Sequence, residues 1–340
     1  MRAVRFHEHG GPEVLRVETA PDPAAGPGEA VVRVRACALN HLDLWQRRGL
    51  HRTPIPLPHI PGSDVSGEVV AAVGGPVRPG TRVMLQPGVS CGHCAWCQAG
   101  RDNECPDYDI LGYRHDGGYA ELVKVPIANL VPIPDRVTFV EAAAFPLTFV
   151  TAWHMLVTRA KVRPGDDVLV LAAGSGVGQA AVQVAALHGA RVIATAGSAE
   201  KLELAKRLGA ADLIDHRSAD IAAEVKRFTH RRGVDIVIEH VGEATWDASM
   251  RALAPGGRLV TCGATTGPSA AIDIRFLFRH QLSVLGSYMG TKGELLEVSR
   301  FFFAGRLAPV IDTTYPLERA AEAQRRLEEG RHFGKIVLEC

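Results

Sequence analysis

Four of the seven cysteines in this 340-residue chain lie close together, in the order Cys91-x2-Cys94-x2-Cys97-x7-Cys105. Thiolates spaced by three residues can surround one side of an ion, and Gly92 and Gly100 permit the tight turns that this requires. Four thiolates complete a tetrahedral zinc shell with no position left for water, so the predicted zinc is structural. The alternatives are an iron–sulfur cluster and disulfide bonds, but an odd cysteine count and tight clustering do not fit a disulfide framework.

A second motif is the turn Ala172-Ala173-Gly174-Ser175-Gly176-Val177-Gly178, which follows a short apolar run at 167–171. A helix from this turn to about His188 would direct backbone N–H groups at the diphosphate of a dinucleotide. Ala173 and Ser175 replace the first two glycines of the usual G-x-G-x-x-G pattern, and Gly178 keeps the third. The predicted contacts from this turn are Gly174, Ser175, Gly176, Val177 and Gly178.

The end of the next predicted strand selects between the two nicotinamide cofactors. NAD enzymes usually place Asp or Glu there to bond the ribose 2′-hydroxyl. Ala196 offers no carboxylate that would repel a 2′-phosphate, whereas Ser198, Lys201 and Arg217 could bind one. Ser198 could equally be a helix N-cap and Lys201 a solvated residue, and both roles are compatible. The sequence therefore favours NADPH, with NADH as the alternative.

Strands and helices alternate around these motifs. Further strands are expected at 190–195, 211–214, 235–239, 258–263 and 281–287, and helices at 200–208, 221–228 and 245–253. This alternation is typical of an α/β fold with a doubly wound parallel sheet, the Rossmann arrangement. Residues 1–125 instead contain short strand-like runs separated by Gly and Pro, such as 30–34, 67–73 and 81–85, which predicts a β-rich domain.

We expect two domains from this pattern. The β-rich domain should span 1–125 and be completed by 286–340, and the dinucleotide-binding domain should span 126–285, with the Pro-rich run 131–134 near the boundary. A net charge of +1 provides no broad basic field for nucleic acid or an anionic membrane. No run reaches the ~18 apolar residues of a membrane span, and the N-terminus lacks the apolar segment of a secretory signal. We therefore expect a cytoplasmic protein without nucleic-acid or membrane partners.

Over its whole length the chain resembles the medium-chain dehydrogenase/reductase superfamily, and it is most similar to quinone-oxidoreductase-like members that keep a structural zinc lobe. The resemblance rests on residues 62–74, the four cysteines, the turn at 172–178 and the closing run Gly334-Lys335-Ile336-Val337-Leu338. It implies a GroES-like β domain beside the Rossmann domain, with NADPH and a small carbonyl compound bound in the cleft between them. It also implies cofactor contacts from Asn40, Thr151, Gly263 and Lys335.

Zinc alcohol dehydrogenases of this superfamily hold a catalytic zinc with Cys, His and Cys. Asn40, Ser63 and Leu147 stand at those positions here. Leu42 also replaces the hydroxyl residue that relays the alcohol proton. Side chains able to bind metal remain nearby, but they would have to reorganise to form a site: His41, Asp43 and Asp64.

The resemblance implies that Asn40 lies beside the nicotinamide and helps to position cofactor or substrate. The alternative is a turn residue that bonds its own backbone. His51 follows Gly49 and Leu50, near where related quinone reductases place a tyrosine. It could donate a proton to the substrate, or it could be a surface histidine of the loop. Asn40 and His51 are the candidate catalytic residues.

Without a Lewis-acid zinc, nothing stabilises the alkoxide that forms when an alcohol is oxidised. Hydride addition to an electron-poor C=C bond needs less help, because hydrogen bonds can stabilise the developing enolate. We therefore predict a reductase of quinones or other α,β-unsaturated carbonyl compounds. One alternative is an alcohol/aldehyde dehydrogenase of the same superfamily. Another is a non-catalytic nucleotide- or RNA-binding protein, although the near-neutral charge and the lack of an aromatic stacking surface argue against RNA.

Related enzymes form dimers by joining Rossmann sheets edge to edge, and tetramers also occur. The apolar stretch at 282–285 could form such an edge. We therefore expect a homodimer or homotetramer.

Overall fold

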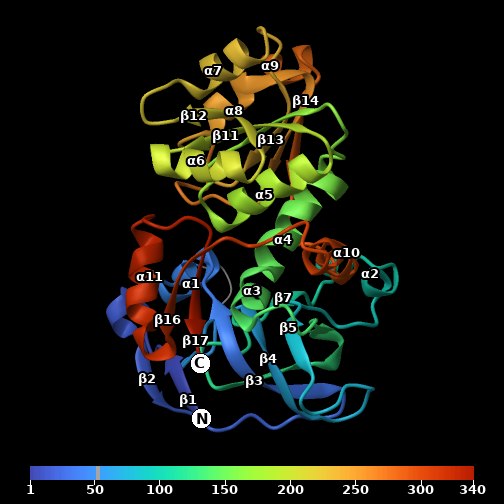
Figure 1. Cartoon of the computed structure of the whole chain (residues 1–340), viewed down its shortest axis with the longest axis vertical. Coiled ribbons are helices and arrows are strands. Elements are labelled where there is room, and N and C mark those ends of the chain that lie inside the picture. The colour runs from blue at the N-terminus through green and yellow to red at the C-terminus, as the bar shows by residue number, and fades with distance from the viewer. Residues whose placement is uncertain (51–53) are drawn as a thin grey trace. The chain divides into compact units, whose positions relative to one another are not determined.

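The computed structural model describes residues 1–50 and 54–340, and these form two compact units. Unit 1 comprises Met1–Leu147 and Thr291–Cys340, and unit 2 comprises Thr148–Gly290 (Figure 1). The chain therefore leaves unit 1, builds unit 2 and returns. None of the described helices is long and apolar enough to cross a membrane.

The sheet of unit 2 is parallel throughout and has the strand order β12-β11-β10-β13-β14-β15. Its strands are β10 (Asp167–Val170), β11 (Arg191–Ala196), β12 (Ala210–Asp215), β13 (Val234–Glu239), β14 (Leu253–Thr261) and β15 (Ser283–Gly286). The chain runs outward from β10 in one direction and then, from β13, in the other. This order is that of the Rossmann fold, whose ligands bind beyond the carboxyl ends of the strands at the point of reversal. The predicted α/β class is confirmed.

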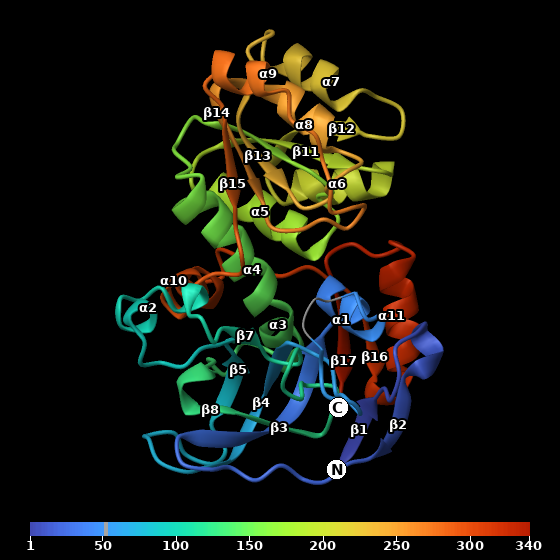
Figure 2. The ribbon, with the colours of Figure 1, turned by 180° about the vertical axis from the view of Figure 1, so that it is seen from behind.

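Helices cover both faces of this sheet, as Figures 1 and 2 show. One face packs against α7, α8 and α9 in a continuous apolar core, and α5 and α6 lie against β10, β11 and β12. The apolar strands are buried by this double cover; every residue of β10, for example, is buried. The helices are α5 (Gly176–Leu187), α6 (Ala199–Arg207), α7 (Ile221–Phe228), α8 (Trp246–Ala252) and α9 (Ile274–Arg279).

Unit 1 is built on a sheet in which the first and last parts of the chain pair. Its strand order is β16-β17-β3-β4-β5-β9, with β8 on β3. The strands are β3 (Glu29–Ala38), β4 (Asp64–Ala72), β5 (Arg82–Leu85), β8 (Leu122–Pro126), β9 (Leu130–Pro132), β16 (Ile311–Pro316) and β17 (Lys335–Glu339). β17 pairs antiparallel with β3, with Val337 opposite Ala38. This register brings Lys335 opposite the residues that follow β3.

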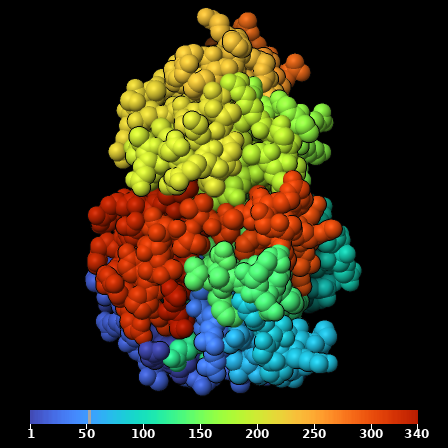
Figure 3. Space-filling model, in the orientation of Figure 1, coloured from blue at the N-terminus to red at the C-terminus, as the bar shows by residue number. Residues whose placement is uncertain are grey.

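Smaller elements complete unit 1. The C-terminal return, coloured orange and red in Figure 3, forms a large part of the visible surface of this unit. A hairpin of β1 (Arg2–Arg5) and β2 (Arg16–Thr19) and a short ladder of β6 (Gly88–Val89) and β7 (Asp109–Ile110) lie outside the main sheet. The helices are α1 (His41–Arg47), α2 (Ala95–Gln98), α3 (Phe139–Ala144), α10 (Lys292–Phe303) and α11 (Ala320–Glu328), and α4 (Pro146–Trp153) spans the division between the units.

The division between the units lies at Leu147 and Gly290, whereas the sequence pattern placed it at 125 and 285. Residues 126–147 belong to unit 1 because β9 pairs with β5, with Val131 opposite Met84, and because α3 packs on β3 and β4. The Pro-rich run 131–134 therefore begins within a strand of unit 1.

Candidate functional site

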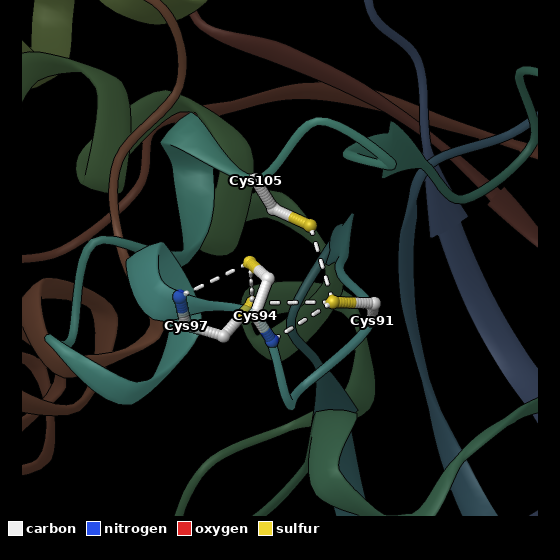
Figure 4. Close-up of side chains that lie close together, drawn as sticks. All are labelled: Cys91, Cys94, Cys97 and Cys105. Carbon is white, nitrogen blue, oxygen red and sulfur yellow. Dashed lines mark hydrogen bonds between the residues drawn. The ribbon is translucent and has the colours of Figure 1, made fainter.

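The cysteine lobe brings four thiols together beside the β6–β7 ladder (Figure 4). Their sulfur atoms all lie within 4.8 Å of one another, with Sγ–Sγ distances of 3.9 Å for Cys91–Cys97 and 3.6 Å for both Cys94–Cys97 and Cys105–Cys91. Zinc–sulfur bonds of about 2.3 Å place the ligands of a tetrahedral site roughly 3.8 Å apart. The geometry therefore fits a zinc ion held by the four predicted residues. These separations are also far longer than a disulfide bond.

Local backbone structure prepares this cluster for thiolate ligands. The backbone N–H of Cys94 donates to Cys91 Sγ at 3.4 Å, and that of Cys97 donates to Cys94 Sγ at 3.5 Å. Backbone N–H groups of His93 and Cys94 hold the pKa of the Cys91 thiol below its usual value. Gly92 and Gly100 have φ angles of 77° and 72°, in the left-handed region that glycine adopts without strain.

A buried ion pair lies beside the positions at which the resemblance places the lost zinc ligands. Lys335 Nζ donates to Asp64 Oδ2 at 3.0 Å and to Asn40 Oδ1 at 2.6 Å. Asn40 Nδ2 donates to the same Asp64 oxygen at 3.0 Å, and the backbone N–H of Leu147 donates to Asp64 Oδ1 at 2.8 Å. Asn40, Asp64 and Lys335 are all buried. The positions that sequence comparison assigned to the lost ligands, at 40, 63 and 147, therefore meet around Asp64.

Both the nitrogen and the oxygen of the Asn40 side-chain amide form hydrogen bonds within this network. Besides its bond to Asp64, Asn40 Nδ2 donates a longer bond to the backbone oxygen of Ala38 at 3.4 Å. Both amide hydrogens thus have acceptors inside unit 1, and the oxygen accepts from Lys335. Asn40 is held as a positioned side chain, and the bond to Ala38 also agrees with the turn role considered above.

A second buried carboxylate, Asp43, lies beside this network. Asp43 Oδ2 accepts from the backbone N–H of Asn40 at 2.8 Å and from the hydroxyl of buried Tyr119 at 3.2 Å. Burial raises the pKa of Asp43 to about 7, and the neighbouring Asp64 charge acts in the same direction. Ser63 Oγ is also buried and has no hydrogen-bond partner among the described residues. His41 lies outside this group, with its ring packed edge-on against Trp45.

The predicted phosphate turn in unit 2 has the form that a diphosphate site needs. Ser175 caps α5, because its Oγ accepts from the backbone N–H of Gly178 at 2.9 Å. A Cβ at Gly178 would lie 2.3 Å from the backbone oxygen of Ala172, so only glycine permits this close approach of helix and turn. Ser175 Oγ also lies 2.9 Å from Nε2 of His240, at the end of β13.

The predicted 2′-phosphate residues gather around Gly197, directly after β11. Ser198 Oγ accepts from the backbone N–H of Lys201 at 3.3 Å, so Ser198 is the N-cap of α6, as the sequence allowed. A Cβ built on Gly197 would lie 2.9 Å from Nε of Arg217 and 3.0 Å from Nε2 of His216. Gly197 therefore lies in close contact with two basic side chains, which leave no room for a Cβ at this position.

The remaining predicted residues are placed as follows. Thr151 is buried on α4, and its hydroxyl has no hydrogen-bond partner among the described residues. Gly263 follows β14, where a Cβ would approach the backbone oxygen of His240 to 3.0 Å. Lys335 Nζ donates to Asn40 and Asp64 within unit 1, and its expected contact with the cofactor stays a prediction. His51 lies outside the described residues.

Sequence reasoning missed His216 and did not assign His240, although both immediately follow strands of the parallel sheet. The signal that could have found them is this position, because carboxyl ends of neighbouring parallel strands meet at one edge. Asp43 and Tyr119 were also not recognised as a pair, since 76 residues separate them.

Comparisons with known proteins agree with this architecture. Residues 26–135 match the alcohol dehydrogenase GroES-like domain, and residues 176–304 match the zinc-binding dehydrogenase family. The chain is 30% identical to quinone oxidoreductase of Homo sapiens, over 99% of this chain and 97% of that protein. A crystal structure of an NAD-dependent alcohol dehydrogenase shares 50% identity and a TM-score of 0.97, with both chains covered completely. Crotonyl-CoA carboxylase/reductase AntE in complex with NADP shares 27% identity and a TM-score of 0.93, over 100% of this chain and 94% of that chain.

The Rossmann sheet, the GroES-like domain and these relatives define a nicotinamide-dependent oxidoreductase. The chain belongs to the medium-chain dehydrogenase/reductase superfamily. The expectation of an enzyme is thus confirmed over the non-catalytic alternative.

The first prediction concerns the metal of the cysteine lobe. The purified protein should contain about one zinc per chain, bound by thiolates alone. Cys97→Ser should lower the melting temperature and the zinc content, because a structural zinc contributes directly to folding. Cys262→Ser, outside the cluster, is the matched control and should leave the zinc content unchanged. Elemental analysis that finds two zinc ions per chain, or none, would contradict the assignment.

Proposed function

We propose that the protein reduces a quinone or another α,β-unsaturated carbonyl compound with NADPH, without a catalytic zinc. The observation that carries this proposal is the buried ammonium of Lys335, 2.6 Å from Asn40 and 3.0 Å from Asp64. A divalent cation bound at Asp64 would lie next to this fixed positive charge in a low-dielectric interior, where like charges repel strongly. The donor set is that of an ion pair and an amide, and not that of a zinc ligand shell.

The chemistry requires little from the protein beyond positioning. When bound, the reduced nicotinamide supplies a hydride to the β-carbon of the acceptor. The chain's residues hold the reactants and support the negative charge that develops on the carbonyl oxygen. We assign Asn40 a positioning role, because Asp64, Ala38 and Lys335 already engage its amide. His51 as the proton donor stays a prediction.

An alcohol dehydrogenase is the second candidate, supported by the solved alcohol dehydrogenase with 50% identity. Within this proposal, such an enzyme would have to stabilise an alkoxide without a Lewis acid at Asp64. Leu42 supplies no hydroxyl for the proton relay. These two features favour the reductase.

A substrate panel separates the two candidates. We expect NADPH oxidation with quinones and enones, and no change in rate after brief treatment with a chelator. Asn40→Ala should lower kcat/KM by roughly 10-fold or more, because misplaced reactants lose much of the benefit of orientation. Asn103→Ala, in the cysteine lobe, is the control and should retain wild-type turnover. Chelator-sensitive oxidation of simple alcohols, with enones inert, would favour the zinc dehydrogenase instead.

We also propose that NADPH is preferred to NADH. The similarity to an NAD-dependent dehydrogenase and to an NADP complex supports a nicotinamide cofactor in general, so the preference rests on this chain's own residues. Ala196 is buried at the end of β11 and carries no carboxylate, and Arg217 lies beside Gly197. Ser198 and Lys201 follow at the start of α6. The unpartnered hydroxyl of Thr151 and the turn at 174–178 supply further proposed contacts to the cofactor.

Binding measurements with both cofactors test this preference. One charge-assisted contact to the 2′-phosphate contributes roughly 1.5–3 kcal/mol, which corresponds to at least about tenfold tighter binding of NADPH. Lys201→Met should weaken NADPH and leave NADH unchanged, and Ala196→Asp should shift the preference towards NADH. Lys206→Met makes the same charge change at the other end of α6 and should alter neither affinity. Equal affinities for the two cofactors in the wild type would refute the proposal.

We propose that the protein assembles through the β15 edge of unit 2. β15 ends the strand order, and Val284 and Leu285 on it are only partly buried. On neighbouring α9, Ile274 and Phe278 are 70% and 67% exposed. An open strand edge with exposed apolar side chains favours pairing with a second copy.

Light scattering should therefore give a mass at least twice the 36.4 kDa of one chain. Replacing both Ile274 and Phe278 with Lys should yield monomers, because buried lysines oppose association. Leu296→Lys, at an exposed position of unit 1, is the control and should keep the wild-type mass. A monomeric wild type at micromolar concentration would rule out this assembly.

A further inference from the structure

The turn at Gly197 lies beside basic groups of different kinds. Arg217 and Lys201 carry permanent charges near neutral pH, whereas the imidazole of His216 can gain or lose a proton there. We propose that His216 takes up a proton when the 2′-phosphate of NADPH binds, so that the preference for NADPH over NADH increases as the pH falls. This inference rests on the proposed NADPH function and adds a pH-responsive residue to it.

The backbone fixes His216 at this position. β11 and β12 pair in parallel with Ala196 opposite Asp215, and the next N–H, of His216, donates to the oxygen of Ala196 at 3.2 Å. The two strands thus deliver Gly197 and His216 side by side at the carboxyl edge of the sheet. Two basic side chains contact Gly197. The position that a Cβ of residue 197 would occupy lies 3.0 Å from Nε2 of His216 and 2.9 Å from Nε of Arg217. Both basic groups therefore lie against the turn at Gly197, and in this proposal the 2′-phosphate binds on their outer side, where it contacts both.

Burial favours the neutral form of His216 before the cofactor binds. Partial burial lowers the pKa of His216; Asp215 opposes this effect, and the positive charges of Arg217 and Lys201 act in the same direction as burial. The carboxylate of Asp215 is also engaged by the backbone N–H of Arg217, at 2.9 Å.

A bound phosphate instead favours the protonated form of His216. A phosphomonoester carries about −1.5 to −2 charges at pH 7, and a negative charge within hydrogen-bond distance favours the protonated imidazole. Binding then raises the pKa of His216 relative to the free protein. At a pH between the pKa of His216 in the free protein and its pKa in the complex, binding takes up one proton. The affinity for NADPH therefore rises as the pH falls through that interval. NADH has a hydroxyl at this position, so its affinity does not increase when His216 is protonated. Near pH 6 the phosphate itself becomes protonated, which limits the gain.

Half-cofactors isolate the effect from catalysis. Adenosine 2′,5′-bisphosphate carries the 2′-phosphate, and adenosine 5′-monophosphate lacks it. Titration calorimetry of the full-length protein in buffers of different ionisation enthalpy counts the protons exchanged on binding, at pH 6.5 and pH 8. The variants are His216→Gln, which cannot be protonated in this range, and His216→Lys, which is always charged. His230→Gln is the matched control, because this exposed histidine precedes β13 and so lies at the opposite edge of the sheet.

We expect the bisphosphate to bind with net proton uptake that the monophosphate does not show. His216→Gln should abolish this uptake and weaken bisphosphate binding at pH 6.5 by roughly tenfold, the value of one charge-assisted contact. His216→Lys should bind tightly at both pH values without the uptake, and His230→Gln should match the wild type. Undiminished uptake in His216→Gln would overturn the inference while leaving the NADPH preference intact. Equal binding of the two half-cofactors by the wild type would overturn the NADPH preference, and the inference with it.

Discussion

The ion pair of Lys335 with Asp64 holds together segments of unit 1 that are distant in sequence. It joins β17 near the C-terminus to the start of β4, and through Asn40 and Leu147 it also reaches the N-termini of α1 and α4. A buried charge is costly unless it is paired and hydrogen-bonded, so each of these partners is needed for the others to be tolerated. The return of the chain to unit 1 therefore supplies the charge partner of Asp64. Without β17, Asp64 would be left as a buried, unpaired carboxylate.

The same ion pair also determines the charge balance of the region. Two buried carboxylates, Asp43 and Asp64, lie near a single buried ammonium. Lys335 bonds Asp64 directly, whereas among the described residues Asp43 receives hydrogen bonds from neutral donors, the N–H of Asn40 and the hydroxyl of Tyr119. Burial raises the pKa of Asp43 to about 7, and the nearby Lys335 charge opposes this rise. Near neutral pH a proton therefore removes part of the negative charge that Lys335 does not balance.

Much of the fold could be predicted from the sequence, because its signals are local. Apolar runs of strand length between amphipathic segments gave the Rossmann sheet, and α7 begins and ends at the predicted residues, Ile221 and Phe228. The four cysteines were predicted from spacing alone, since the whole cluster lies within one loop. The extent of unit 1 was harder to predict, because the pairing of β9 with β5 is a contact between residues about fifty positions apart.

Long-range contacts among the site residues could not be predicted from the sequence. The bonds of Lys335 join it to residues 271 and 295 positions earlier, and no spacing rule reveals such contacts. The position of His216 beside Gly197 depends on the pairing of β11 with β12. Ser175 was found from a local motif, whereas its contact with His240 joins residues 65 positions apart.

The parallel sheet explains why these residues, distant in sequence, lie close together. The phosphate turn, Gly197, His216, His240 and Gly263 follow β10, β11, β12, β13 and β14 in turn, and the carboxyl ends of these strands share one edge. At the phosphate turn the backbone and Gly178 supply the shape, so this part of the site tolerates few changes. Beyond β11 and β12 the groups at the edge are side chains on exposed turns. The fold therefore provides a dinucleotide site, and in the proposals above residues 196–201 and 216–217 set the choice of cofactor and its pH dependence without a change in the sheet.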